Sequence, residues 1–332
     1  MKKKLLLFSF LIISMIFFFI LFRPDEQLKI NIHSKILKSR NFKQLTIIDS
    51  ITLPIKTSLI YHLESSENLL LVPFEIVDKF YKMENKILKD TIYFNPNYIF
   101  NDILVSTNGN TYATFWKKDT AIIVHLNSKR NTEFRLKLQE RIVGFFNDEA
   151  VYLQTLSDSV FLKSVNIYTA KHRTIINLTK YWKKLAPIDN LNYTCQLTST
   201  NNRLLIKSIY SSFGLLLDSL NNICVQSIDS LELPEIKIDT LDKGIFQMNV
   251  NPSLYSSSQI FAHSNYFYNF SEIGIDNNSY YLDVYNFDYK YLFSYRIPFA
   301  NKIKPYSIAI NFDKNEISVL YNDYFTLKKF SY

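Results

Sequence analysis

The residue types that most often carry metal chemistry are present in this chain, but they are widely separated. The histidines are His33, His62, His125, His172 and His263. Zinc sites usually take ligands from short spacings such as HExxH or CxxC, and neither spacing occurs. A ring-shaped fold could still gather distant side chains at its axis, so a central site stays open. From the linear motifs we predict no metal and no cofactor.

Acid-rich and nucleophilic motifs are equally uninformative. Residues 229–242 hold five carboxylates, but calcium loops need the spacing Asp-x-Asp-x-Asp-Gly, which this lysine-interrupted stretch lacks. Ser264 follows His263 without a GxSxG context, and the five isolated glycines form no phosphate-binding loop. The acidic stretch is best interpreted as a solvated connection, and the catalytic residues stay unassigned.

Residues 263–279 form the most conspicuous candidate for binding, since they are predicted as a long aromatic loop between two strands. Loops of more than about 12 residues are commonly functional, and exposed aromatic side chains often anchor recognition surfaces. A polar, helix-like insert at 179–190 is a second candidate. The predicted binding residues are His263, Asn265, Tyr266, Tyr268 and Trp182. The alternative, that the aromatic residues of 263–279 pack onto a neighbouring sheet, stays open.

A repeated strand–turn–strand pattern must position these residues. Good copies lie at 111–126, 150–165 and 316–330, where apolar residues alternate on both sides of a short polar turn. The second strands of six such units begin about 50 residues apart on average, enough for four short strands each. The sequence therefore predicts an all-β fold, a six-bladed β-propeller over residues 42–332, with seven blades as the alternative.

The two ends of the predicted ring complement each other. The last unit supplies only three strands, whereas residues 42–50 have strand composition and no hairpin partner. We predict that this N-terminal strand completes the last blade, because closure removes an open sheet edge. The strands of the fifth blade are predicted at 245–250, 258–264, 280–286 and 290–298. Cys195 and Cys224 are predicted on the first and fourth strands of one blade, a placement that disfavours a disulfide.

The C-terminal third carries a family resemblance. Residues 282–285 read LDVY and residues 291–298 read YLFSYRIP, with a polar turn between them. This pattern resembles the closing blades of bacterial exported six-bladed propellers of the NHL-like and TolB-like group. The resemblance implies the fold and a role as a binding platform, and it transfers no catalytic residue. The scarcity of glycine at the turns departs from that group.

The N-terminus predicts a membrane anchor. Residues 5–22 are eighteen consecutive uncharged residues, which as a helix would span about 27 Å. Lys2–Lys4 precede them, so residues 1–4 are expected in the cytoplasm and the rest of the chain on the periplasmic, extracytoplasmic side of the inner membrane. The apolar run ends in bulky residues rather than a cleavage site, which favours an anchor over a cleaved signal peptide. Residues 23–41 are predicted as a tether.

The net charge of +8 does not indicate nucleic-acid binding. Half of it comes from residues 1–23, and no basic run in the remainder exceeds two residues. Nucleic-acid surfaces need clustered lysine and arginine. The sequence thus predicts a membrane-tethered module that binds a protein, peptide or envelope component. The alternative is a hydrolase or lyase acting on a glycan or peptide, with carboxylates or histidines gathered at the axis.

Overall fold

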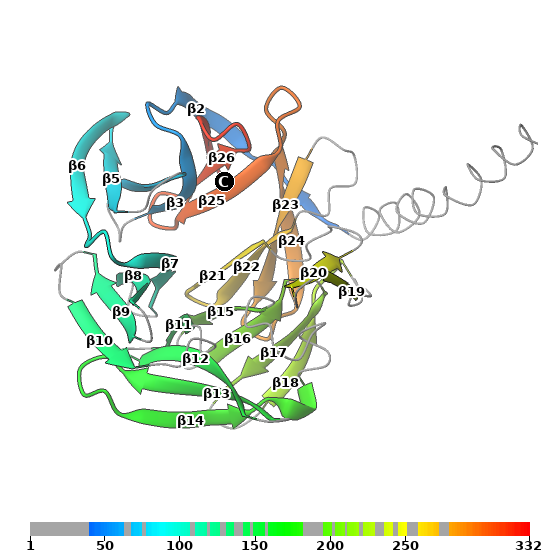
Figure 1. Cartoon of the computed structure of the whole chain (residues 1–332). Helices are drawn as coiled ribbons and strands as arrows, with labels where there is room; N and C mark the ends of the chain where they lie inside the picture. The colour runs from blue at the N-terminus through cyan, green and yellow to red at the C-terminus, as the bar shows by residue number, and fades with distance from the viewer. Residues whose placement is uncertain are drawn as a thin grey trace, which may run out of the picture.

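Six antiparallel sheets follow one another around a ring in the computed structural model of the chain, which confirms the six-bladed β-propeller (Figure 1). The structure describes residues 40–332 apart from 63–67, 75–77, 107–109, 118–119, 127–130, 136–141, 147–148, 157–158, 182–194, 201–202, 210, 219–221, 230–235, 242–244, 251–257 and 272–278.

The first half of the ring consists of three blades of four strands each. Blade one comprises β3 (Thr57–His62), β4 (Leu69–Pro73), β5 (Lys79–Glu84) and β6 (Ile87–Tyr93). Blade two comprises β7 (Ile99–Val105), β8 (Thr111–Lys117), β9 (Thr120–His125) and β10 (Asn131–Arg135). Blade three comprises β11 (Ile142–Phe146), β12 (Glu149–Leu156), β13 (Ser159–Asn166) and β14 (His172–Asn177).

The second half has three further blades and a separate hairpin. Blade four comprises β15 (Cys195–Thr200), β16 (Arg203–Ser208), β17 (Phe213–Leu217) and β18 (Asn222–Gln226). The hairpin comprises β19 (Ile236–Leu241) and β20 (Ile245–Val250). Blade five comprises β21 (Gln259–His263), β22 (Tyr266–Ser271), β23 (Ser279–Asn286) and β24 (Tyr291–Pro298). Blade six comprises β25 (Pro305–Asn311), β26 (Glu316–Tyr321), β27 (Thr326–Ser331) and β2 (Thr46–Thr52).

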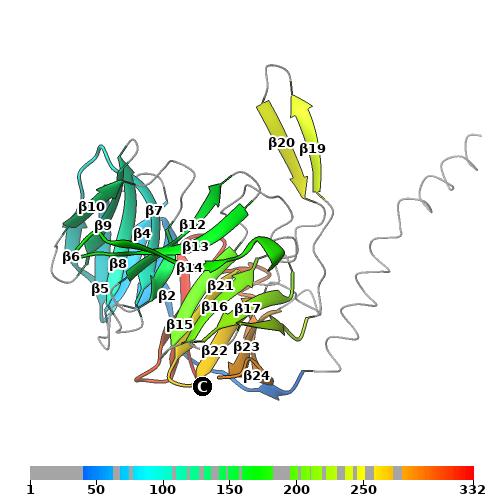
Figure 2. The same ribbon diagram turned by 90° about the horizontal axis from the view of Figure 1, so that it is seen from below.

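Blade five differs from its prediction. Residues 245–250 pair with β19 and project from the ring as the hairpin in Figure 2, instead of forming the first strand of the blade. The predicted long loop at 263–279 is wrong, because residues 266–271 form strand β22. A two-residue turn connects β21 to β22, and Ser264 there adopts a φ of 52°. Serine is uncommon at a left-handed position, so Ser264–Asn265 is a weaker hairpin signal than a turn that contains glycine.

The N-terminal strand closes the ring as predicted. β2 pairs antiparallel with β27 from Thr46 opposite Ser331 to Thr52 opposite Thr326, and so supplies the fourth strand of blade six. One part of the prediction is corrected: Phe42–Lys43, strand β1, pairs in parallel with β24 of blade five. The chain thus bridges two blades before it completes the second.

The segment that leads into β1 is held by the residues of the LDVY and YLFS motifs. The Arg40 guanidinium donates to both carboxylate oxygens of Asp283, at 2.9 and 2.8 Å, and both side chains are fully buried. Ser294 donates to the same carboxylate at 2.6 Å, and the Tyr291 hydroxyl accepts from the Asn41 amide at 2.9 Å. The polar residues Asp283, Tyr291 and Ser294 of these motifs therefore hold the incoming N-terminal chain against blade five.

Hydrogen bonds between side chains and the backbone join neighbouring blades near the axis, where the first strand of each blade lies. The Ile308 amide donates to Gln259 Oε1 at 2.7 Å, which links blades six and five. Ser199 Oγ donates to the Phe145 carbonyl at 2.8 Å, which links blades four and three. The seams between blades are otherwise filled by apolar side chains. These contacts hold neighbouring blades against each other, and so they also set where the turns at the ends of the strands lie relative to one another.

Two further expectations concern the termini and the cysteines. No helix in the described part of the chain is long and apolar enough to cross a membrane. The predicted segment 5–22 and most of the tether lie outside the described residues. Cys195 lies on β15 and Cys224 on β18, the first and fourth strands of blade four, and the two form no disulfide with each other.

Candidate binding site at the seam of blades five, six and one

The predicted binding residues of blade five lie on and beside one turn. His263, Asn265 and Tyr266 are exposed at the β21–β22 turn, Tyr266 with 42% of its surface accessible. Tyr268 is buried, and burial raises its pKa to about 12, as expected for a tyrosine of the core. Tyr268 therefore packs against the neighbouring blade, as the alternative interpretation expected, whereas the residues of the turn are exposed. Trp182 lies outside the described residues.

Phe312 connects this turn to blade six. Its ring stacks on His263 at 4.3 Å between centroids, with 8° between the planes, and lies 5.1 Å from Tyr268. Phe312 belongs to the turn between β25 and β26. Since both turns follow the first strand of their blades, they lie on the same face of the ring, here called the upper face. An exposed strip thus runs from 263–266 to 312–315.

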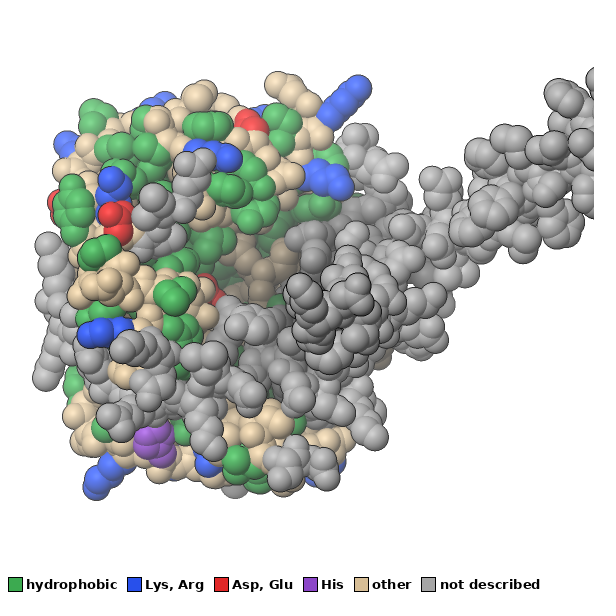
Figure 3. Space-filling model, viewed as in Figure 1, with side chains coloured by type: hydrophobic (Ala, Val, Ile, Leu, Met, Phe, Trp, Pro, Cys, Tyr) green, Lys and Arg blue, Asp and Glu red, His purple; other side chains and the backbone are tan. Residues whose placement is uncertain are grey.

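The centre of the ring is hollowed in Figure 3, and the described side chains visible inside it are mostly hydrophobic or uncharged. Among the residues that the structure describes, no three His, Cys, Asp or Glu side chains lie close enough together to hold a metal ion. A group of charged side chains that is open to solvent lies at a seam between two blades.

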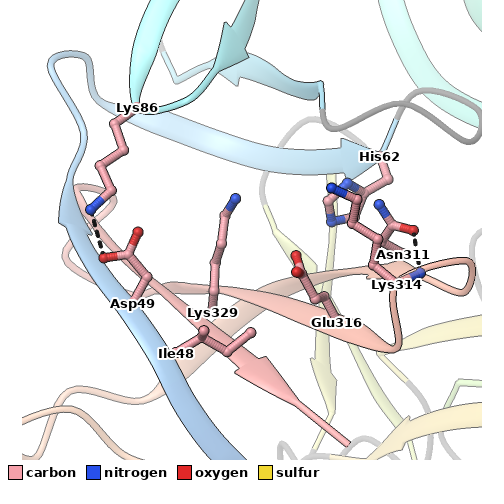
Figure 4. A pocket seen from close by; sticks show the side chains of 8 residues that line it. All are labelled: Ile48, Asp49, His62, Lys86, Asn311, Lys314, Glu316 and Lys329. Carbon is pink, nitrogen blue, oxygen red and sulfur yellow. Dashed lines mark hydrogen bonds and ion pairs between the residues drawn. The ribbon is translucent and has the colours of Figure 1, made fainter.

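A pocket of about 340 Å³ opens between blades six and one, beside the exposed strip (Figure 4). Blade six contributes strands β2, β25, β26 and β27 and the β25–β26 turn, and blade one contributes β3 and the β5–β6 turn. The lining residues are Ile48, Asp49, His62, Lys86, Asn311, Lys314, Glu316 and Lys329. A site of this size accommodates a small ligand or one side chain of a larger partner.

Strand register explains why charged groups gather here. On the face of blade six that meets blade one, Ile51, Leu327 and Leu320 pack into the apolar seam. Side chains two residues apart on a strand point to the same face of the sheet. Asp49, Lys329 and Ser318 are each two residues from Ile51, Leu327 and Leu320, respectively, so they lie on this same face, closer to the upper face of the ring. Asp49 pairs with Lys329, which pairs with Ser318 on its other side. The register shifts at Ile48, the kind of irregularity that re-aims side chains.

The charges of the pocket are unevenly paired. Lys86 Nζ lies 2.8 Å from Asp49 Oδ1, and this contact is the main reason that the pKa of Asp49 is lowered. The charge of Lys329 lowers the pKa of Asp49 further. Within the described part of the chain, Lys329 makes no ion pair. It is half-buried in the middle of the pocket.

His62 forms the wall of the pocket on the side of blade one. Its Nε2 lies 3.3 Å from Ser318 Oγ, whereas its Nδ1 is buried without a hydrogen-bond partner among the described residues. Burial, helped by the charge of Lys329, lowers the pKa of His62 to about 4. The imidazole is therefore neutral at physiological pH and adds no charge to the three ammonium groups.

Comparisons with known proteins found similar solved structures but no match to a family model or to a curated sequence. Similar solved structures include the β-propeller domain of Myceliophteria thermophila Cps50 (Swd1), at 10% identity and a TM-score of 0.46, covering 87% of this chain and 99% of that one. Another is a chain of a Mitotic Checkpoint Complex, at 11% identity and a TM-score of 0.48, covering 86% and 93%.

Sequence reasoning missed the pocket. Its residues come from both ends of the chain, and they converge only because β2 joins blade six. One signal was present: Asp49 and Lys329 interrupt strands whose period-two positions are otherwise apolar, Ile51 and Leu327. A charge at an inward position of a strand is costly unless it is paired or open to solvent, so it marks a position to inspect.

Proposed function

We propose that this protein is a membrane-tethered binding module, with residues 5–22 in the inner membrane and the propeller on the extracytoplasmic side. Its partner is a protein, a peptide or an envelope component. The binding surface is the exposed strip of the upper face, 263–266 and 312–315, together with the pocket at its end.

One observation carries this proposal: the exposed strip continues into an open pocket that holds three ammonium groups. Exposed tyrosine, histidine and half-buried phenylalanine side chains supply apolar contact area, and the pocket supplies directional charge. Interfaces commonly combine such anchors with a few charged contacts. The resemblance to exported propellers that act as binding platforms supports the same role.

Site-specific photo-cross-linking tests the proposal. A photoreactive phenylalanine analogue at Asn265 should capture a discrete partner in spheroplasts, and protease added from outside should destroy the adduct. The matched control is Asn97, an exposed residue of the β6–β7 connection, because connections between successive blades lie on the opposite face. Equal adducts from both positions would refute the assigned surface. An adduct at Asn265 that resists protease in spheroplasts would refute the extracytoplasmic location.

A further inference from the structure

The pocket at the seam of blades six and one has a free positive charge at its centre. Of its three lysines, Lys86 is neutralised by Asp49 at 2.8 Å. Lys329 has no ion-pair partner among the described residues, although it stands between Asp49 and Ser318 in the strand register. A half-buried ammonium group loses part of its hydration, and an incoming anion would replace that loss.

The groups around Lys329 set the shape of what can bind. Neutral His62 and Asn311 offer hydrogen bonds, while Lys314 extends from the exposed strip at the pocket's rim. Glu316, which has no ion pair in the described part of the chain, also lines the pocket. A second negative charge on the ligand would approach this carboxylate and be repelled. The arrangement therefore favours a single compact anionic group over a polyanion.

From this geometry we infer that the pocket binds one carboxylate or phosphate group of the ligand, with Lys329 as its principal contact. The inference rests on the proposed binding function and adds the chemistry of its ligand. The volume of about 340 Å³ fits a sugar phosphate or an acidic side chain with its flanking backbone. A carboxylate would come from a protein or peptide, and a phosphate from a lipid headgroup or an envelope polymer.

The neighbouring lysine on β27 provides a matched control. Lys328 and Lys329 are adjacent and both half-buried, but successive side chains of a strand point to opposite faces of the sheet. Lys328 Nζ accordingly lies 5.7 Å from the ring centroid of Tyr321, which packs in the seam with blade five. Lys328→Gln and Lys329→Gln therefore make the same change of charge on the same strand, and only the second removes charge from the pocket.

The test is a titration of the full chain, in non-ionic detergent, with inorganic phosphate and separately with the α-amide of N-acetylglutamate, whose only carboxylate is that of the side chain. Binding is followed by the NMR signals of the His62 ring. Wild type and Lys328→Gln should both bind at least one of the two probes, with the same apparent Kd. Lys329→Gln should weaken binding at least tenfold, and Lys329→Arg should restore most of it. The thermal unfolding of each variant confirms that it is folded.

Two results would overturn the inference: no response of the His62 ring in wild type, or equal weakening by Lys328→Gln and Lys329→Gln. The preferred probe distinguishes the two ligand sources. Cross-linking at Asn265 is scored independently. If the adduct forms and the titration fails, the binding role stands and the pocket does not hold the partner through an anionic group. If the titration succeeds and no adduct forms, the pocket binds an anion without the macromolecular partner proposed above.

Discussion

Two ion pairs only nine residues apart, at Arg40 and Asp49, show how burial decides what a charge does in this molecule. Arg40 and Asp283 are both fully buried, with two hydrogen bonds between them. Lys86 and Asp49 are 56% and 25% exposed and share one contact. The first pair docks the chain onto blade five. The second lies in a pocket open to solvent, beside Lys329, which makes no ion pair with any residue that the structure describes. Buried charge here serves architecture, whereas accessible charge is available to a ligand.

The largest effect is expected when the buried Arg40–Asp283 pair is broken by removing Asp283. Burial alone would lower the pKa of Arg40, but Asp283 outweighs it and the pKa is raised, so the guanidinium stays charged. Asp283→Ala leaves that buried cation without its partner and should lower the free energy of unfolding by about 3–5 kcal/mol. Urea denaturation measures the loss.

Asp288→Ala is the matched control, because Asp288 pairs with Arg203 at 2.9 Å while 59% exposed. An exposed pair contributes less than about 1 kcal/mol. Equal destabilisation by the two variants would show that the Arg40 contact is no more important than a surface ion pair. The double variant Arg40→Met/Asp283→Leu should recover most of the stability lost by Asp283→Ala, since it leaves no unpaired charge.

An intermediate effect is expected from His62 as the pH falls. Its pKa is about 4 in the folded chain against an ordinary 6.5, so the unfolded chain takes up the proton first. The contribution of neutral His62 is therefore complete above pH 6.5 and is lost between pH 6.5 and 4, a change of up to about 3 kcal/mol. Urea denaturation across this range should show the slope in wild type.

His62→Gln should flatten that slope, because it removes the group whose pKa is lowered in the folded chain. If the free energy of unfolding of His62→Gln falls with pH as steeply as that of wild type, other groups cause the loss of stability in acid. Repeating the series with an anion that fills the pocket would also show whether the bound ligand favours protonation of His62.

The smallest effect is expected for the exposed pair. Lys86→Gln should change the free energy of unfolding by less than about 1 kcal/mol, and high salt should abolish the difference, because solvent and ions screen such contacts. Denaturation at low and high salt measures both. A loss comparable with that of Asp283→Ala would remove the distinction between the two ion pairs.

The sequence predicted the ring because each blade repeats the same period-two alternation, and it predicted closure because one strand at each end lacked a partner. It failed in blade five, where Ser264 turns the chain without glycine and residues 245–250 have strand composition but pair outside the ring. The pocket was beyond such reasoning. Its residues face one another only through the register of β2 on β27 and the packing of His62 against Ser318, and neither follows from local pattern.

Because Thr46 pairs with Ser331, strand β2 can join its sheet only after β27 has been synthesised. During synthesis β2 emerges before the strands of the other five blades, whereas its partner β27 follows every other described strand. Until then β2 has no sheet to join, and Ile47 and Ile48, about half exposed even in the finished fold, stay available to other chains. A nascent chain interrupted anywhere before residue 326 would therefore carry an unsatisfied strand at its beginning. Pairing with the six-residue strand β27 covers the open edge of β2, and open strand edges favour aggregation.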